Sequence, residues 1–382
     1  MTNGLIQLVA QGAQDAYLTE NPQITFFKKI YRRHTNFALE AIEQTNLGTV
    51  AFGGKFSVEV ARNGDLINRI MLEVDLPELS GATTANGYVD WVGHRLIEEV
   101  WVEIGGQQVD IKDYNFNWAM DQLREGDNLG YETMLGKTGS DHNAGSKRLY
   151  IPIRVWFSDD IGLALPLVAL QYHQVKLTFR LASKDSLFDT SANSTANQPE
   201  VNCFIDYVYL DKDERLRFAQ VAHEYLITQT QSSGKDGFSN CVHKARLNFN
   251  HPCKELIWLV REDCGGDPHK WTQYKTCKEA VLVLNNTDRF QKRGGEYFTL
   301  VQPWQHHSNV PESQNVHVYS FAINPEEHQP SGTCNMSRIE NTVLHLTMND
   351  ADKDKDHVVF VYAVNYNVLR IMHGMGGIAY SN

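Results

Sequence analysis

The charged segment LDKDERLRFAQ (210–220) divides this chain into two halves whose strand patterns repeat in the same order. Before it stand GKFSVEVA (54–61), INRIMLEVDLP (67–77), EEVWVEIGGQQVD (98–110) and the aromatic-bearing NFNWAMDQL (115–123). After it stand HKARLNFN (243–250), KELIWLVRE (254–262), AVLVLNNTDRF (280–290) and the aromatic-bearing EYFTLVQPW (296–304). An ordered internal repeat indicates two copies of one structural unit. We therefore predict a short charged helical joint at 211–220 between two similar domains.

Strand-like alternation dominates both halves. Phe56, Val58 and Val60 alternate with polar neighbours, and a period of two marks a strand with one buried face and one exposed face. Similar runs occur at 69–77, 98–111, 148–157, 177–181, 203–210, 224–231, 255–261, 280–286, 317–323, 342–348 and 358–369. Many short strands between Gly, Asn, Asp and Pro turns are typical of an all-β sandwich.

The expected fold is an all-β double jelly roll, in which two tandem eight-stranded antiparallel β-sandwiches carry short helices in their loops. Short helices are expected near 21–33, 115–125 and 213–222. The predicted domains are an N-terminal arm (1–24), a first jelly roll (25–210) and a second jelly roll (211–382).

Composition excludes several classes of protein. The 382 residues include 35 Lys and Arg against 46 Asp and Glu, a net charge of −11 that opposes binding to phosphate backbones. We therefore expect no direct nucleic-acid binding. The start of the chain shows no pattern of a secretory signal, and the longest apolar run (161–170) is too short to span a bilayer. The six cysteines form no CxxC pair, so reduced thiols are expected.

Motifs that could support catalysis or metal binding are incomplete. The loop GYETMLGKTGS (130–140) has five residues between its glycines instead of four, and NDADKDKD (349–356) lacks the Gly and Glu of a calcium loop. The neighbouring His306 and His307 are expected to face opposite ways rather than to share a metal. We predict no catalytic, cofactor-binding or metal-binding residues and no cofactor.

Two features leave other interpretations open. The basic run Lys28, Lys29, Arg32, Arg33 and His34 fits a solvated helix face or interface salt bridges better than a phosphate contact. Trp271, Tyr274 and Trp304 are expected to be exposed and would suit a glycan-binding module. An enzyme such as a glycan hydrolase needs two carboxylates at a defined separation, and the sequence singles out no such pair.

The chain resembles one family from about residue 4 to residue 382. The start, GLIQLVAQGAQDAYLTENPQITFFKKIYRRHTNFALEAI (4–42), closely resembles the N-terminal signature of the major capsid proteins of nucleocytoplasmic large DNA viruses. The likeness continues through GDLINRIMLEVDLPEL (64–79), LNFNHPCKELIW (247–258), HQPSGTCNMSRIEN (328–341) and NYNVLRIMHGMGGIAYSN (365–382). Departures include Glu20, Glu340 and Asn286, which stands where Gly is usual. Asn tolerates a left-handed backbone, so the turn at Asn286 is expected to survive.

The resemblance implies a structural protein rather than an enzyme. It implies a homotrimer that forms a pseudo-hexagonal capsomer, contacts neighbouring capsomers and tiles the icosahedral shell of a large DNA virus. The protein would be made in the host cell cytoplasm and located in the virion. The N-terminal arm, with apolar Leu5, Ile6, Leu8 and Val9, would face inward toward minor capsid proteins or the internal virion membrane. The alternatives are a minor capsid paralogue and a glycan-binding jelly-roll module.

Overall fold

A computed structural model describes residues 3–79, 87–126, 128–137, 147–189, 197–263, 267–313, 315–349 and 355–381. The chain divides into two compact units, Met1–Asn36 and Phe37–Asn382.

The first unit contains two short helices, α1 (Asn3–Val9) and α2 (Ala16–Thr19), followed by a segment without helix or strand up to residue 36. The helix expected at 21–33 is therefore wrong. Between residues 16 and 36 every side chain is exposed, so a helix there would have no packed face to stabilise it. Pro22 and the β-branched Ile24 and Thr25 further disfavour a helix.

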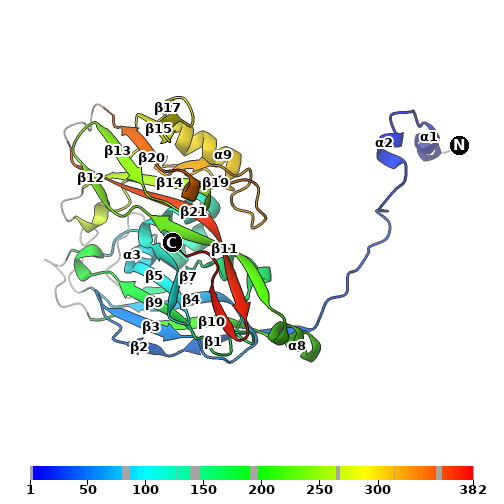
Figure 1. Cartoon of the computed structure of the whole chain (residues 1–382), viewed down its shortest axis with the longest axis horizontal. Coiled ribbons are helices and arrows are strands. Elements are labelled where there is room, and N and C mark those ends of the chain that lie inside the picture. The colour runs from blue at the N-terminus through cyan, green and yellow to red at the C-terminus, as the bar shows by residue number, and fades with distance from the viewer. Residues whose placement is uncertain are drawn as a thin grey trace. The chain divides into compact units, whose positions relative to one another are not determined.

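The second unit contains two antiparallel β-sandwiches (Figure 1). In the first, sheet A has the order β1-β10-β4-β7 with β8 beside β4, and sheet B has the order β2-β3-β9-β5-β6. The bounds in sheet A are β1 (Phe37–Gln44), β10 (Glu200–Leu210), β4 (Leu66–Leu76), β7 (Lys147–Ile153) and β8 (Leu165–Pro166). Those in sheet B are β2 (Asn46–Gly48), β3 (Lys55–Glu59), β9 (Val175–Leu181), β5 (Ile97–Ile104) and β6 (Gln107–Asp113).

The second sandwich repeats this arrangement. Sheet C has the order β11-β21-β14-β18, and sheet D has the order β13-β20-β15-β16. Sheet C comprises β11 (His223–Ser232), β21 (His357–Met372), β14 (Pro252–Glu262) and β18 (His317–Ser320), with β12 (Asp236–Phe238), β19 (Cys334–Asn335) and β22 (Met375–Ile378) at its margins. Sheet D comprises β13 (Val242–Leu247), β20 (Thr342–Thr347), β15 (Glu279–Leu284), β16 (Thr287–Asp288) and β17 (Arg293–Gly294). In the described residues, each sandwich has eight strands of at least four residues.

Short helices lie in the connections, as expected. Two of them follow equivalent strands: α4 (Tyr114–Arg124) follows β6, and the π-helical turn η4 (Tyr297–Val301) with α9 (Gln302–His306) follows β17. The predicted joint is the exposed helix α8 (Lys212–Gln220). The others are α3 (Val92–Leu96), α5 (Leu129–Leu135), α6 (Trp156–Asp159), η1 (Ile161–Leu163), η2 (Lys184–Ser186), η3 (Pro268–Lys270) and η5 (Met336–Arg338).

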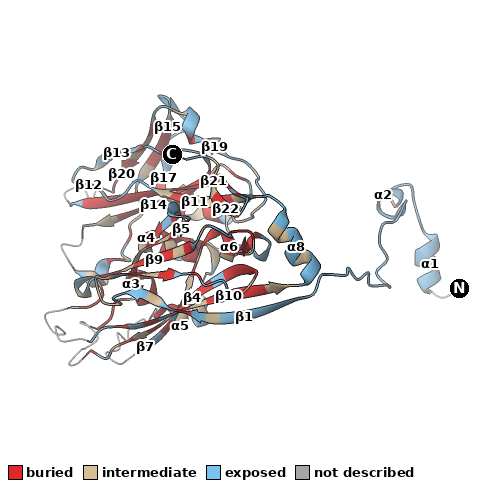
Figure 2. Cartoon of the chain, turned by 60° about the horizontal axis from the view of Figure 1, so that its bottom comes forward, coloured by how far each residue is buried: buried red, intermediate tan, exposed pale blue. Residues whose placement is uncertain are grey.

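The core of the second sandwich lies between sheets C and D and includes Trp258, Leu282 and Leu344. The core of the first sandwich is continuous with the opposite face of sheet C, because Ile257 and Tyr362 belong to the same apolar cluster as the residues between sheets A and B. Alternate residues of β14 and β21 therefore enter two different cores. Figure 2 shows this burial along β14 and β21, whereas β1 and α8 are largely exposed.

The two turns that join equivalent strands have the same conformation but different residues. Gly105 and Gly106 join β5 to β6, with φ of 58° and 82°. Asn285 and Asn286 join β15 to β16, with φ of 48° and 63°. Two consecutive positive φ values fit a tight hairpin turn of the primed type. The expectation that Asn286 supports this turn is therefore confirmed.

Candidate assembly interface

The helix α4 lies at the junction of the two sandwiches. Its Phe116 ring is 5.5 Å from the ring of Tyr362, and its Trp118 ring is 5.0 Å from Tyr274 and 6.2 Å from Trp271. Trp271 and Tyr274 are only 3% and 7% exposed, so the expectation that they lie on the surface is wrong. Their polar atoms are satisfied within the junction: Trp271 Nε1 donates to the Asp90 carbonyl at 3.0 Å. Aromatic residues with one polar atom suit such a site because they pack and also hydrogen-bond.

Two buried carboxylates join β6 to the second sandwich. Asp113 Oδ2 accepts a hydrogen bond from Tyr362 at 2.6 Å, and Asp113 Oδ1 caps α4 by accepting from the Phe116 amide at 2.9 Å. Burial raises the pKa of Asp113 to about 6, although both hydrogen bonds oppose this shift. Asp110 Oδ1 accepts from the Thr230 amide of β11 at 2.9 Å. These contacts hold the two sandwiches in one relative position.

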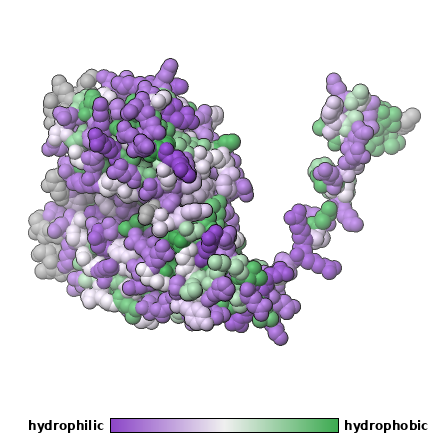
Figure 3. Space-filling view, viewed as in Figure 1, coloured by the Kyte–Doolittle hydropathy of each residue, from purple (hydrophilic) through white to green (hydrophobic). Residues whose placement is uncertain are grey.

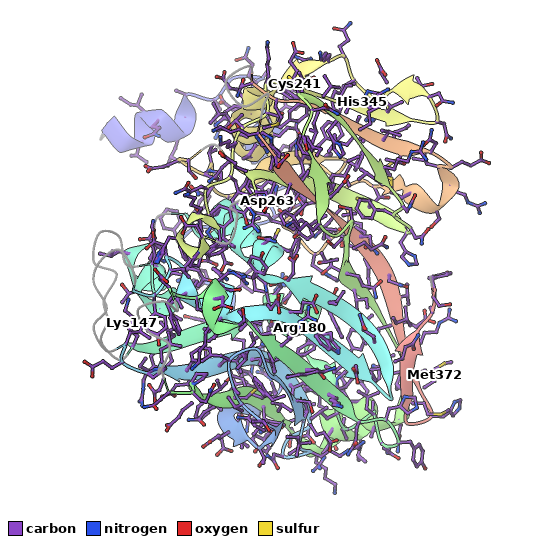
Figure 4. All side chains as sticks on the ribbon, turned by 90° about the vertical axis from the view of Figure 1, so that its left-hand side faces the viewer. Lys147, Arg180, Cys241, Asp263, His345 and Met372 are labelled. Atoms are coloured by element: carbon purple, nitrogen blue, oxygen red, sulfur yellow. The ribbon has the colours of Figure 1, made fainter. Side chains whose placement is uncertain are left out.

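A groove of about 810 Å³ opens between the sandwiches beside these carboxylates. Its lining includes Arg180, which pairs with Glu98 at 3.2 Å and Glu99 at 2.9 Å, and Lys235, which pairs with Asp263 at 3.4 Å. Figure 4 shows Arg180 on the first sandwich and Asp263 on the second. These cations already have carboxylate partners, so the groove does not present them as a free anion site.

Buried ion pairs anchor α4 and α9 to their own sandwiches. Under α4, Asp121 contacts His94 Nε2 at 3.0 Å and Arg154 Nε at 2.6 Å. Beside α9, His307 Nε2 lies 3.1 Å from Glu255, and its Nδ1 lies 3.0 Å from Glu326. Burial alone would lower the pKa of His307, but the two carboxylates outweigh it and raise that pKa to about 9.

The other side of α9 is exposed. Trp304 is 75% exposed, as the sequence suggested, and lies beside a shallow apolar hollow of about 340 Å³ that it lines with Leu300, Val301 and Val310. Ile323 is 69% exposed and adjoins the helix, because its carbonyl lies 2.8 Å from His306 Nδ1. Sequence patterns indicate no member of this patch other than Trp304, because Trp304, Val310 and Ile323 come from separate segments.

The outer face of sheet A is also partly exposed. Met71 of β4 lies opposite both Phe204 of β10 and Pro152 of β7, and all three are only partly buried. Arg148 flanks this row and pairs with Glu73 at 3.0 Å. The face therefore combines an apolar centre with a charged rim, which is the composition of many protein interfaces.

The described residues of the first unit, Met1–Asn36, expose both apolar and basic side chains. Leu8, Phe26 and Phe27 are 68%, 89% and 98% exposed, and Figure 3 shows hydrophobic side chains on the arm helices. The basic run 28–34 is exposed but not helical, so its interpretation as a helix face is wrong. No helix in the described part of the chain is long and apolar enough to span a membrane.

The incomplete motifs do not converge in the structure. Among the described residues, no group of three or more His, Cys, Asp or Glu is arranged to hold a metal ion. His306 contacts a backbone carbonyl, whereas His307 contacts two carboxylates, so the two rings have different partners. The glycine-rich segment 130–140 begins in α5, and its residues 138–140 lie outside the described part, as do residues 350–354 of the acidic run.

Comparison with known proteins identifies the fold. The chain matches the solved structure of VP54 from Paramecium bursaria Chlorella virus 1 with a TM-score of 0.84 and 37% identity, over 94% of this chain and 100% of that chain. The Faustovirus major capsid protein matches with a TM-score of 0.78 at 11% identity, which shows the fold alone. These structures are double jelly-roll capsid proteins, so the predicted fold class is confirmed.

The family follows from sequence. Residues 25–211 match the model of the major capsid protein N-terminus, and residues 214–377 match that of the large eukaryotic DNA virus major capsid protein. The major capsid protein of Pyramimonas orientalis virus is 46% identical over 412 residues, covering 100% of both chains. That of Paramecium bursaria Chlorella virus 1 is 40% identical over 445 residues, again with full coverage.

The chain belongs to the major capsid proteins of large eukaryotic DNA viruses. Its role is structural and non-enzymatic, and its place is the capsid of the virion. The resemblance stated from sequence is confirmed.

Proposed function

We propose that this capsid protein forms homotrimers whose six sandwiches make a pseudo-hexagonal capsomer, and that these capsomers tile an icosahedral shell. The observation that carries the proposal is the continuous apolar cluster that joins the first sandwich to the outer face of sheet C. It makes one chain a rigid pair of similar blocks, and threefold closure of such pairs yields six blocks. The solved capsid of Paramecium bursaria Chlorella virus 1, matched at a TM-score of 0.82, supports self-association.

The proposed domains are the arm (1–24), the first jelly roll (25–210) and the second jelly roll (211–382), with α8 as the joint. In support, sheets A and B use residues between 37 and 210, and sheets C and D use residues between 223 and 378. The family matches, 25–211 and 214–377, divide the chain at the same place.

Light scattering tests the trimer. A chain of 43.4 kDa gives 3 × 43.4 = 130.2 kDa for a trimer, and electron micrographs should show pseudo-hexagonal particles or shells. A monomer at micromolar concentration would contradict the proposal. Elemental analysis after dialysis against a chelator tests the prediction that the protein holds no metal, because stoichiometric zinc or calcium would contradict it.

We further propose that the arm contacts minor capsid proteins or the internal virion membrane, and that the protein is made in the host cell cytoplasm. Exposed Leu5, Ile6 and Leu8 support a contact role, because large apolar side chains are costly to leave in water. Deleting residues 1–21 should leave the melting temperature within a few degrees, because an undocked terminus adds little to the core. The same deletion should impair shell formation. Failure of the truncated chain to fold would contradict this role.

A glycan-binding role finds little support, because burial of Trp271 and Tyr274 removes two of the three aromatic rings on which it rested.

A further inference from the structure

The two sandwiches use equivalent surfaces differently. In sheet C, both faces of β14 are buried: Trp258 enters the core of its own sandwich, and Ile257 enters the cluster shared with the first sandwich. In sheet A, residues 69–76 of β4 are buried on one face only. Ile70 and Leu72 face inward, whereas Met71 on the outer face is partly exposed and Arg69 is exposed. At the start of β4, Leu66 packs with Val208 and with Phe218 of α8 in a separate small cluster. Sheet A has the strand order of sheet C, but in the described residues the part of its outer face around Met71 lacks the cover that sheet C has.

The cover of sheet C is supplied by α4 and β6 of the first sandwich. Phe116 of α4 packs on Tyr362, and β6 contacts β11 through Asp110 and the Thr230 amide. Both elements come from the far edge of sheet B and the connection that follows it. The junction inside the chain therefore joins the edge of one sandwich to the outer face of the next.

The second sandwich carries the counterparts of α4 and β6, and they are exposed. The equivalent strands β16 and β17 have exposed residues throughout, and the equivalent helix α9 presents Trp304 at 75% exposure. In α4, by contrast, Trp118 is 3% exposed. Within the described residues, α9 and the β16–β17 edge therefore cover no sheet of the other sandwich, and the outer face of sheet A around Met71 has no equivalent helix and edge over it.

Resting on the proposed trimer, we infer that α9 and the β16–β17 edge of one copy pack over the outer face of sheet A of a second copy. Trp304 would lie against the apolar row of Met71, Phe204 and Pro152, in the way that α4 packs on sheet C inside the chain. The same rotation that relates the two sandwiches would then be repeated between chains, and such a head-to-tail contact can close into a ring. Met71, Phe204 and Pro152 lie on the outer face of sheet A. The chain covers the equivalent face of sheet C with its own α4 and β6, so the fitting occupant of sheet A is a second copy of this chain.

The apolar hollow beside Trp304 suits this partner. It is shallow and lined by Leu300, Val301, Trp304 and Val310 without a charged residue. A body with a net negative charge repels its own copies, so contacts between copies need apolar anchors. Exposed tryptophans are frequent anchors of protein interfaces.

The test uses one variant on each surface of the full-length chain. Trp304→Arg and Met71→Arg should each convert the trimer into a monomer in analytical ultracentrifugation, with at least a tenfold rise in the concentration needed for association. Both residues are exposed or partly so, and circular dichroism should show an unchanged fold. Val301→Asp, in the adjoining turn η4, serves as a second variant of the same surface if Trp304→Arg misfolds.

Mixing the two variants tests whether the two surfaces meet. The Met71→Arg chain retains Trp304, and the Trp304→Arg chain retains Met71, so the pair has one intact contact. The mixture should form a dimer of 2 × 43.4 = 86.8 kDa that neither variant forms alone. Tyr172→Arg is the matched control, because Tyr172 is 76% exposed but lies on a different loop, and its variant should remain trimeric.

The outcomes separate this inference from the proposed trimer. A monomeric unmodified chain would overturn both. A trimeric unmodified chain whose Trp304→Arg or Met71→Arg variant is equally trimeric would overturn the inference alone. The same holds if Tyr172→Arg dissociates the trimer instead, or if the mixture of the two monomeric variants stays monomeric.

Discussion

Sheet A and sheet C have the same strand order, yet they differ in what covers them. The central strand β21 of sheet C sends Val361 into the second core and Tyr362 into the cluster shared with the first sandwich. Figure 4 shows this strand running down to Met372 beside the first sandwich. The corresponding strand β10 of sheet A buries Cys203 but leaves Phe204 only partly buried. The chain therefore covers the outer face of sheet C, whereas the equivalent face of sheet A is available for contact with a second copy.

The helices that follow equivalent strands show the same difference. Both are fastened to their own sandwich by a buried ion pair, through Asp121 for α4 and through His307 for α9. Among the described residues, only α4 packs its aromatic side chains on the other sandwich. This contrast indicates that the ion pairs fix both helices on their own sandwiches independently of assembly.

The largest expected effect comes from removing the anchor of α9. His307→Ala should lower the free energy of unfolding by about 3 to 5 kcal/mol, because it leaves the carboxylate of Glu255 buried without its partner. His306→Ala is the control and should cost less than about 1 kcal/mol, because it removes a single hydrogen bond to a backbone carbonyl near the surface. Urea unfolding of both variants measures the difference.

The same anchor predicts a pH dependence. The pKa of His307 is raised to about 9 in the folded protein, above its usual value of 6.5. Its contribution to stability should therefore be complete below pH 6.5 and lost as the pH rises through 9. The difference between the unmodified chain and His307→Ala should shrink over this range. A constant difference up to pH 10 would show that the ion pair is not the cause.

The second prediction compares the outer faces of the two sheets. Ile257→Ala on sheet C should lower the free energy of unfolding of the protomer by about 3 kcal/mol, since it opens a cavity in a packed core. Met71→Ala on sheet A should lower it by less than about 1 kcal/mol, because that side chain is only partly buried. Equal losses, measured below the concentration of association, would contradict the claim that the two faces are covered differently.

The third prediction concerns the carboxylate at the junction of the sandwiches. The pKa of Asp113 is raised to about 6, so the protonated form is favoured by folding, and the associated stability is lost as the pH rises from about 4 through 6. Asp113→Asn keeps a cap for α4 through its Oδ1 and does not ionise. Its Nδ2 donates to the Tyr362 hydroxyl, as the O–H of the protonated carboxyl does. The variant should be more stable than the unmodified chain by roughly 2 kcal/mol at pH 7.5, and equally stable at pH 4. A variant that is less stable at both values would mean that the charge itself is needed.

The smallest effect is expected at the turn between β15 and β16. Asn286→Gly should raise the free energy of unfolding by about 0.5 kcal/mol, because Gly adopts a positive φ without steric cost. Asn285→Gly should lower it by about 1 kcal/mol, because the Asn285 side chain accepts from the amides of Glu340 at 3.0 Å and Asn341 at 3.1 Å. Thermal unfolding of the two variants should shift in opposite directions.

The equivalent turn of the first sandwich contains Gly105 in place of Asn285. A Cβ on Gly105 would lie 2.4 Å from His173 Nδ1, so Gly105→Ala should destabilise the protein more than either substitution in the second turn. A neutral Gly105→Ala would show that the two turns are under the same constraint.

The sequence alone determined the strands, the two-sandwich plan and the family. Alternation of apolar and polar residues fixes which side of a strand is buried, and the repeat on either side of α8 fixes the number of sandwiches. It placed Trp271 and Tyr274 on the surface, which is wrong, because their burial depends on Trp118 of α4, which lies about 150 residues away in sequence. The helix predicted at 21–33 failed for a related reason, since a local pattern does not supply the surface that a short helix needs.

Only the tertiary structure decided which surfaces remain for assembly. β4 and β14 both contain apolar residues on their outer faces, and Met71 and Ile257 differ little as residues. Their environments differ because α4 and β6 cover sheet C, whereas sheet A has no such cover in the described residues of Phe37–Asn382. Burial by a distant element is a property of three-dimensional packing, and the periodicity of a single strand does not encode it.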